Sequence, residues 1–144
     1  MRRLALVVIL VLVAGSLTAC GSGHKKPSGP SAQTQIKSAY QEFFSSKTSL
    51  SDRVALLQDG PKFKTVIQAF ASNPLAKNVT VSVSSVTLQG TDNAKVVYVV
   101  KFSGSSLPKQ NGTAVRENGT WKVGFASLCR LVALGGTTPA ACKS

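Results

Sequence analysis

The sequence has few residues that could carry out acid–base or metal chemistry. Its 144 residues include one histidine, three cysteines and five acidic residues, against 17 Lys and Arg, and the net charge is +12. The histidine, His24, lies in a polar segment near the N-terminus, which excludes a histidine triad or a core histidine as general acid or base. These residues do not make a metal-ligand set, so we expect no metal. We also expect no cofactor and no catalytic residue.

The carboxylates are also dispersed. They are expected at helix ends, on a helix face, in a turn and beside a hairpin tip: Glu42, Asp52, Asp59, Asp92 and Glu117. A Gly-rich phosphate loop after a strand is also lacking. The remaining enzymatic alternative is a pocket lined by Tyr40, Tyr98 and Glu42. We favour a protein that is not an enzyme.

The excess of basic residues is spread along the chain. Outside Lys25 and Lys26, they occur singly from Lys37 to Lys143, without a basic helix or an aromatic-interleaved basic strip. This distribution argues against nucleic acid as a partner. It suits contact with anionic envelope lipids or acidic wall polymers, although a generic basic surface has the same composition.

The N-terminus has the pattern of a bacterial lipoprotein precursor. Arg2 and Arg3 precede an apolar run from Leu4 to Gly15, and the four residues Leu17 to Cys20 read as a lipobox. The run is shorter than the about 20 apolar residues of a membrane span. We expect cleavage after residue 19 and a diacylglyceryl (palmitate-type) modification of Cys20, against the alternatives of ordinary secretion or a retained anchor helix.

The rest of the chain then forms a short linker and one domain. Residues 20–32 are polar and rich in Gly, Ser and Pro, which predicts a flexible tether, and residues 33–144 suffice for a single small domain. Outside the cytoplasm, the even pair Cys129 and Cys142 is expected to form a disulfide that staples a C-terminal lobe, worth about 3 kcal/mol.

Helical spacing marks the first half of the domain. A helix is predicted over Gln33 to Ser46, and a short one after Ser49, which has capping-box spacing with Asp52. A third helix is predicted from Pro61, which suits a first turn, to the Asn73 and Pro74 pair that ends it.

After Pro74 the hydrophobic period changes to two. Strands are predicted from Val79 to Leu88, with a bulge near Ser84 and Ser85, and from Ala94 to Phe102. Two further strands flank an Asn-Gly hairpin turn at Asn118 and Gly119. In the last strand, we expect Trp121, Val123 and Phe125 to share the face that packs on the helices.

Helices followed by an antiparallel meander predict an α+β domain, with N-terminal helices on a curved four-stranded sheet. This order looks like the cone-shaped cystatin-like and nuclear-transport-factor-2-like folds, which enclose an apolar pocket. The ligand-binding residues expected there are Phe63, Ile67, Phe70, Tyr98 and Trp121. The alternative, a core that these side chains fill, is the one we favour.

Several segments occur in an order typical of one family. They run from Ser51 to Gly60, Asn73 to Ala76, Gly119 to Val123, Ser127 to Leu134 and Pro139 to Cys142. Over roughly Gln33 to Cys142, the chain resembles the mycobacterial low-molecular-weight secreted antigen family. The resemblance implies an actinobacterial envelope or secreted protein without established catalytic activity. The lipobox departs from the secreted members and favours attachment to the surface.

The sequence thus predicts a non-enzymatic lipoprotein on the extracytoplasmic face of the cell membrane, held there by the lipid on Cys20. Its domain is expected to act in interactions, with a protein partner that the sequence does not identify. The alternative function is a carrier or binding module for an apolar or lipid-like envelope ligand in the cone.

Overall fold

The computed structural model describes residues 29–143. Helices come first: α1 (Ala32–Phe44), α2 (Leu50–Leu56) and α3 (Lys64–Ser72), with 3₁₀ turns η1 (Gly60–Phe63) and η2 (Pro74–Asn78) before and after α3. The strands follow as β1 (Val79–Gln89), β2 (Asn93–Phe102), β3 (Ser105–Ser106), β4 (Gln110–Glu117) and β5 (Thr120–Val123). The chain ends with α4 (Phe125–Leu134) and η3 (Ala140–Cys142).

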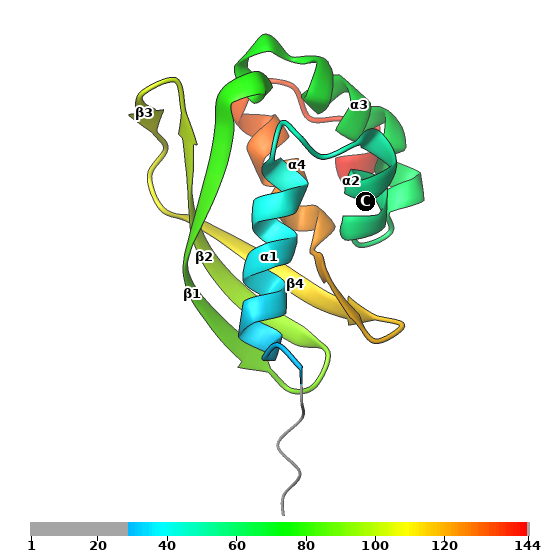
Figure 1. The fold of residues 1–144 in the computed structure, drawn as a ribbon. Coiled ribbons are helices and arrows are strands. Elements are labelled where there is room, and N and C mark those ends of the chain that lie inside the picture. The colour runs from blue at the N-terminus through cyan, green and yellow to red at the C-terminus, as the bar shows by residue number, and fades with distance from the viewer. Residues whose placement is uncertain (1–28, 144) are drawn as a thin grey trace, which may run out of the picture.

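The sheet is antiparallel and curls around α1 (Figure 1). Its order is β1-β2-β4-β5, and the short β3 pairs with the end of β2. The predicted bulge is confirmed, because the register of β1 against β2 shifts between Val83 and Ser85. The predicted α+β cone with helices on a curved sheet is therefore present, with one strand more than the four expected.

The core lies between α1 and the concave face of the sheet. One stripe of α1 is buried at the helical spacing of i, i+3, i+4, i+7 and i+8: Ile36, Ala39, Tyr40, Phe43 and Phe44. These residues meet the inward-facing side chains of β2, where Ala94, Val96, Tyr98 and Val100 alternate with more exposed ones. Burial of this stripe fixes α1 across the sheet.

The predicted caps and turns are present. Ser49 caps α2 by accepting a hydrogen bond from the Asp52 amide at 3.1 Å and donating one to the Asp52 carboxylate at 2.6 Å. Asn118 and Gly119 form the β4–β5 turn, both with positive φ. The third helix starts as the 3₁₀ turn η1 at Gly60 and becomes α-helical at Lys64.

The prediction for Phe125 was wrong. Instead of continuing β5, it begins α4, and its ring stacks on Phe63 at 5.3 Å between centroids. Gly124 makes the turn possible, because a Cβ there would collide with the Thr113 side chain. The alternation of Trp121, Val123 and Phe125 therefore predicts a strand that is two residues longer than β5.

Strand β5 covers only part of the edge of β4. Helix α4 lies against the rest of that edge, where a strand would otherwise pair. The Thr113 amide donates to the Ser127 hydroxyl at 3.1 Å, and the Arg130 guanidinium donates to the Asn111 carbonyl. Ser127 and Arg130 are three residues apart and lie on one face of the helix. This face satisfies backbone groups at the open edge of β4.

Candidate functional site

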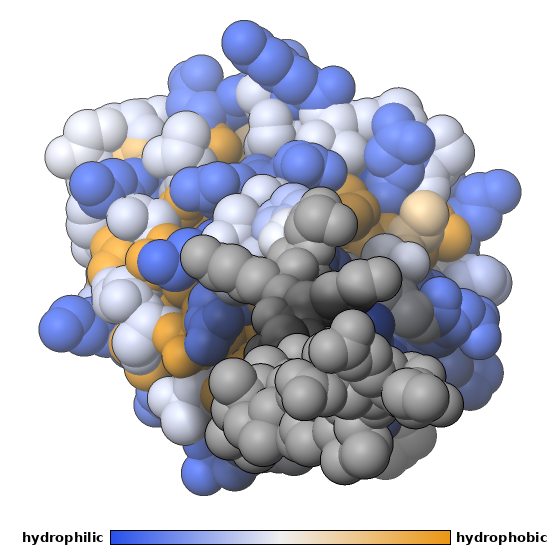
Figure 2. All heavy atoms as spheres, turned by 60° about the horizontal axis from the view of Figure 1, so that its bottom comes forward, coloured by the Kyte–Doolittle hydropathy of each residue, from blue (hydrophilic) through white to orange (hydrophobic). Residues whose placement is uncertain are grey.

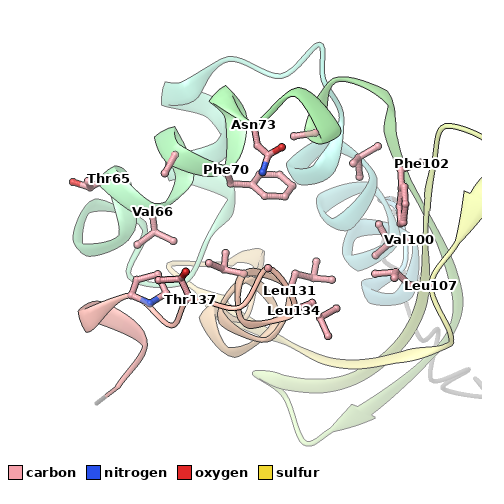
Figure 3. Close-up of a pocket in the computed structure, with 16 residues that line it drawn as sticks. Thr65, Val66, Phe70, Asn73, Val100, Phe102, Leu107, Leu131, Leu134 and Thr137 are labelled. Atoms are coloured by element: carbon pink, nitrogen blue, oxygen red, sulfur yellow. The ribbon is translucent and has the colours of Figure 1, made fainter.

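A pocket with a volume of about 560 Å³ opens at one end of the domain (Figure 3). It lies between α3 with η2, the beginning of β1 with the end of β2, and the segment from α4 to Pro139. Its size is within the range of about 300–1,000 Å³ typical of small-molecule sites. The lining residues are Thr65, Val66, Ala69, Phe70, Asn73, Ala76, Val79, Val100, Phe102, Leu107, Leu131, Val132, Leu134, Gly135, Thr137 and Pro139.

The helical wall rests on the aromatic core. Phe70 of α3 packs edge-on against Phe44 of α1, with 6.1 Å between ring centroids. Figure 3 shows the Phe70 ring facing the pocket below the Asn73 side chain. Phe70 is half-buried, so one side of its ring joins the core and the other faces the pocket.

The sheet wall consists of the inner-face residues at one end of β1 and β2. Val79 and Phe102 are paired across the two strands, and Val100 is two residues from Phe102 on the same face. The segment after β3 returns to β2, where the Leu107 amide donates to the Val100 carbonyl at 2.9 Å. Leu107 thereby closes the side of the pocket (Figure 3).

The third wall is enclosed by the disulfide. Cys129 and Cys142 are bonded, as predicted, with a Cα–Cα distance of 5.5 Å. The loop between them supplies six lining residues, Leu131, Val132, Leu134, Gly135, Thr137 and Pro139. In Figure 3, Leu131 and Leu134 point from α4 into the space. Leu134 is also 58% exposed, which places it at the opening.

The pocket lining has no ionisable side chain. Thr65, Asn73 and Thr137 are its polar members, and most of the others are aliphatic or aromatic. Groups of this kind can hold an apolar molecule and hydrogen-bond a polar end, but they cannot transfer a proton at neutral pH.

A buried cation lies behind the pocket. Arg53 is 3% exposed, and its guanidinium carbon is 5.9 Å from the centroid of the Phe70 ring. It donates to the Ser45 carbonyl at 2.6 Å and to the Thr48 carbonyl at 3.2 Å, while Nη1 has no partner among residues 29–143. Burial lowers the pKa of Arg53, but arginine remains charged in proteins.

The tyrosines lie in the core, outside the pocket. The Tyr40 hydroxyl donates to the Thr113 carbonyl at 2.7 Å and is 2.9 Å from the Ser127 hydroxyl, which can donate to it. The Tyr98 hydroxyl is buried and has no partner among the described residues. Burial raises the pKa of Tyr98 to about 12 and that of Tyr40 further. Both stay protonated at neutral pH.

The predicted ligand-binding residues separate into two groups. Phe70 lines the pocket. Four others are at most 4% exposed and fill the core instead: Phe63, Ile67, Tyr98 and Trp121. The predicted lipidation site, Cys20, and the histidine, His24, lie outside the described residues.

The carboxylates do not converge in the described part of the chain. Asp59 pairs with Lys62 at 3.3 Å, and Glu117 pairs with Lys122 at 2.9 Å. Within residues 29–143, no group of three or more His, Cys, Asp or Glu side chains could hold a metal ion. No helix of this part is long and apolar enough to cross a membrane.

The residues of the C-terminal wall are not predicted from the sequence. Leu128, Leu131 and Val132 repeat at helical spacing, which is the signal that could have identified α4. Leu107 carries no such signal, because it follows a two-residue strand in a loop.

Comparisons with known proteins bear on the fold and the family. No curated protein matches the chain. Among solved structures, the chain is similar to a Campylobacter jejuni protein described as an NTF2-like transpeptidase, at 14% sequence identity and a TM-score of 0.43. That alignment covers 61% of this chain and 92% of the other. A family model also matches residues 29–139 and confirms the resemblance expected from the sequence. Because this model describes the C-terminal domain of low molecular weight antigen MTB12, the chain belongs to that family.

Proposed function

We propose that this protein is a non-enzymatic, lipid-anchored module of the bacterial envelope that binds an apolar or amphipathic molecule. The observation that carries the proposal is the pocket of about 560 Å³ with its largely apolar lining. Exposed apolar surface gathered in a concavity is a common feature of ligand sites. Transfer of an apolar chain from water into this space is worth about 0.8 kcal/mol per buried CH₂.

A binding role fits the pocket better than a catalytic one. Its lining has no acid, base or nucleophilic cysteine, because both cysteines of the adjoining loop are in the disulfide. The tyrosine hydroxyls of the core are held neutral by burial and lie outside the lining. These features support a binding function without catalysis.

The described domain begins on the far side from the pocket. Phe44, at the C-terminal end of α1, contacts Phe70 of the pocket wall. Ala32, at the other end of this 13-residue helix, is about 18 Å away along its axis. Figure 1 shows the N-terminal end of α1 opposite α3 and β3. The proposed tether would therefore join the domain at the end opposite the pocket.

The second candidate is a domain that holds a protein partner at the membrane. Its support is Leu134, which is 58% exposed at the pocket rim and continues the apolar surface of the lining. The charged surface gives less support, because hydrophilic side chains are spread over the face in Figure 2, with small apolar patches between them. Under this alternative, the rim contacts a partner and the pocket takes up no separate ligand.

Nile red, a neutral dye that fluoresces in apolar surroundings, tests binding directly. We expect saturable fluorescence with one site per protein. Ala69→Trp should weaken it strongly by occupying part of the pocket, because Ala69 is an exposed residue of α3 that lines the space. Ala71→Trp is the matched control, since Ala71 is exposed on the same helix outside the lining. Absence of saturable binding, or equal binding by both variants, would contradict the proposal.

A further inference from the structure

We infer that the ligand of this pocket is an anionic amphiphile, with its chain inside and a phosphate or carboxylate headgroup at the opening. The inference rests on the proposed function and adds the charge of the ligand. The pocket interior has no charged side chain, so a charge on the ligand must stay at the rim. The charges around the rim therefore decide which headgroup is favoured.

The segments that build the pocket contain basic residues and no acidic ones. Every lining residue lies in 64–79, 100–109 or 131–143. These three ranges have no Asp or Glu, and their charged residues are Lys64, Lys77, Lys101, Lys109 and Lys143. The five acidic side chains of the chain all lie in other segments.

Three of these lysines lie next to the lining on separate parts of the wall. Lys64 adjoins Thr65, Lys77 adjoins Ala76, and Lys109 is two residues beyond Leu107. All three are exposed. Since neighbouring Cα atoms are 3.8 Å apart, the Cα atom of each lysine lies within about 8 Å of the Cα atom of a lining residue, a separation comparable to the Debye length at physiological salt.

The buried cation behind the pocket adds to the same field. Arg53 lies over the Phe70 ring, and among residues 29–143 the ion pairs formed by carboxylates involve Lys62 and Lys122 instead. Because Arg53 is 3% exposed, water and salt screen its charge less than that of a surface lysine. A negative headgroup near the pocket thus meets basic residues at the rim and behind the wall.

Displacement of Nile red by three lauroyl lipids tests the inference. They have the same chain and different heads: anionic lysophosphatidylglycerol, zwitterionic lysophosphatidylcholine and neutral monolauroylglycerol, all below their micelle concentrations. We expect the anionic lipid to bind at least about tenfold more tightly than the neutral one at low salt. The difference should shrink as NaCl is added. Glycerol 3-phosphate, the head without the chain, should not displace the dye.

Two triple variants locate the effect. Lys64→Gln/Lys77→Gln/Lys109→Gln should remove most of the preference for the anionic lipid. The control Lys37→Gln/Lys95→Gln/Arg116→Gln removes the same charge from exposed residues outside the three segments and should retain the preference. Of these, Lys95 is seven residues from Phe102 along β2, about 23 Å away.

The outcomes separate the inference from the function on which it rests. Equal affinity for the three lipids, or a preference that survives the pocket variant, would overturn the anionic headgroup and leave apolar binding intact. Displacement by glycerol 3-phosphate alone would also overturn it. Failure of Nile red and all three lipids to bind would overturn both proposals.

Discussion

Two tyrosines in the core show how differently buried hydroxyl groups affect stability. Tyr40 and Tyr98 are fully buried, with 5.1 Å between ring centroids. The Tyr40 hydroxyl contacts Thr113 and Ser127, whereas the Tyr98 hydroxyl has no partner among the described residues. A buried hydroxyl without a partner carries a desolvation cost that a satisfied one does not.

This contrast predicts opposite effects of the same substitution. Tyr40→Phe should lower the free energy of unfolding by about 1–3 kcal/mol, because it leaves the Thr113 carbonyl and Ser127 without their partner. Tyr98→Phe should leave it unchanged or raise it by up to about 1 kcal/mol. Urea unfolding followed by the fluorescence of the buried Trp121 measures both. A larger loss for Tyr98→Phe would be inconsistent with the described contacts.

The pKa of Tyr98 predicts a loss of stability in alkali. Burial raises this pKa from 10.0 to about 12, so between these values the folded state holds a proton that the unfolded state has released. The unfolded state is then favoured as pH rises, by up to about 3 kcal/mol for this residue. Unfolding free energies from pH 9 to 12 should fall more steeply for the wild type than for Tyr98→Phe. Parallel curves would count against the shift.

Gly112 is needed for the close approach of β4 to these residues. A Cβ there would lie 2.5 Å from the Tyr40 hydroxyl, 2.6 Å from the Ser127 hydroxyl and 2.8 Å from the Tyr98 ring. Gly112→Ala should therefore destabilise the fold by about 1–3 kcal/mol. Gly29→Ala, where a Cβ meets nothing within 4 Å, is the control and should change stability by less than about 0.5 kcal/mol. Equal unfolding midpoints would show that β4 is not confined in this way.

Sequence signals are sufficient to predict those elements that depend only on residues close together in the chain. The apolar stripe of α1, the Ser49 cap and the Asn118–Gly119 turn each depend on a few neighbouring residues, and each was predicted. Helix α4 was missed because an alternating pattern continued through Gly124 to Phe125. The chain can turn into this helix because Gly124 has no side chain to collide with Thr113 of β4.

The pocket could not be located from the sequence for a similar reason. Four of the five residues expected to line it belong to the buried core cluster, so the cone is filled: Phe63, Ile67, Tyr98 and Trp121. The space arises instead where the ends of α3, β2 and α4 meet. Periodicity predicts which face of an element is apolar, but it does not predict which faces leave a gap between them.

The disulfide loop forms a pocket wall, so breaking the bond should affect binding as well as stability. Cys129→Ser/Cys142→Ser should lower the free energy of unfolding by about 3 kcal/mol. It should also weaken Nile red binding several-fold where the variant is still folded, because six lining residues lie in the loop. Reduced and alkylated wild type should behave in the same way. Unchanged affinity in a destabilised variant would show that other contacts hold this wall.

The proposed lipid anchor and the folded domain can be separated by one substitution. Two acyl chains hold a protein on a membrane far more firmly than one. Cys20→Ser should therefore move the protein from the detergent phase to the culture medium, while the folded domain and its Nile red binding stay unchanged. Membrane retention of this variant would contradict anchoring through Cys20.

The release of the Cys20→Ser form also allows ligand binding by the pocket to be tested without membrane lipid in the sample. The measurement is mass spectrometry of organic-solvent extracts from this form after secretion by a bacterial host, with and without Ala69→Trp. The proposed binding predicts an amphiphile in near-stoichiometric amount from the protein with Ala69, and a strongly reduced amount from the Ala69→Trp variant, whose larger side chain occupies part of the pocket. Extracts without any amphiphile, or with equal amounts from both proteins, would contradict it.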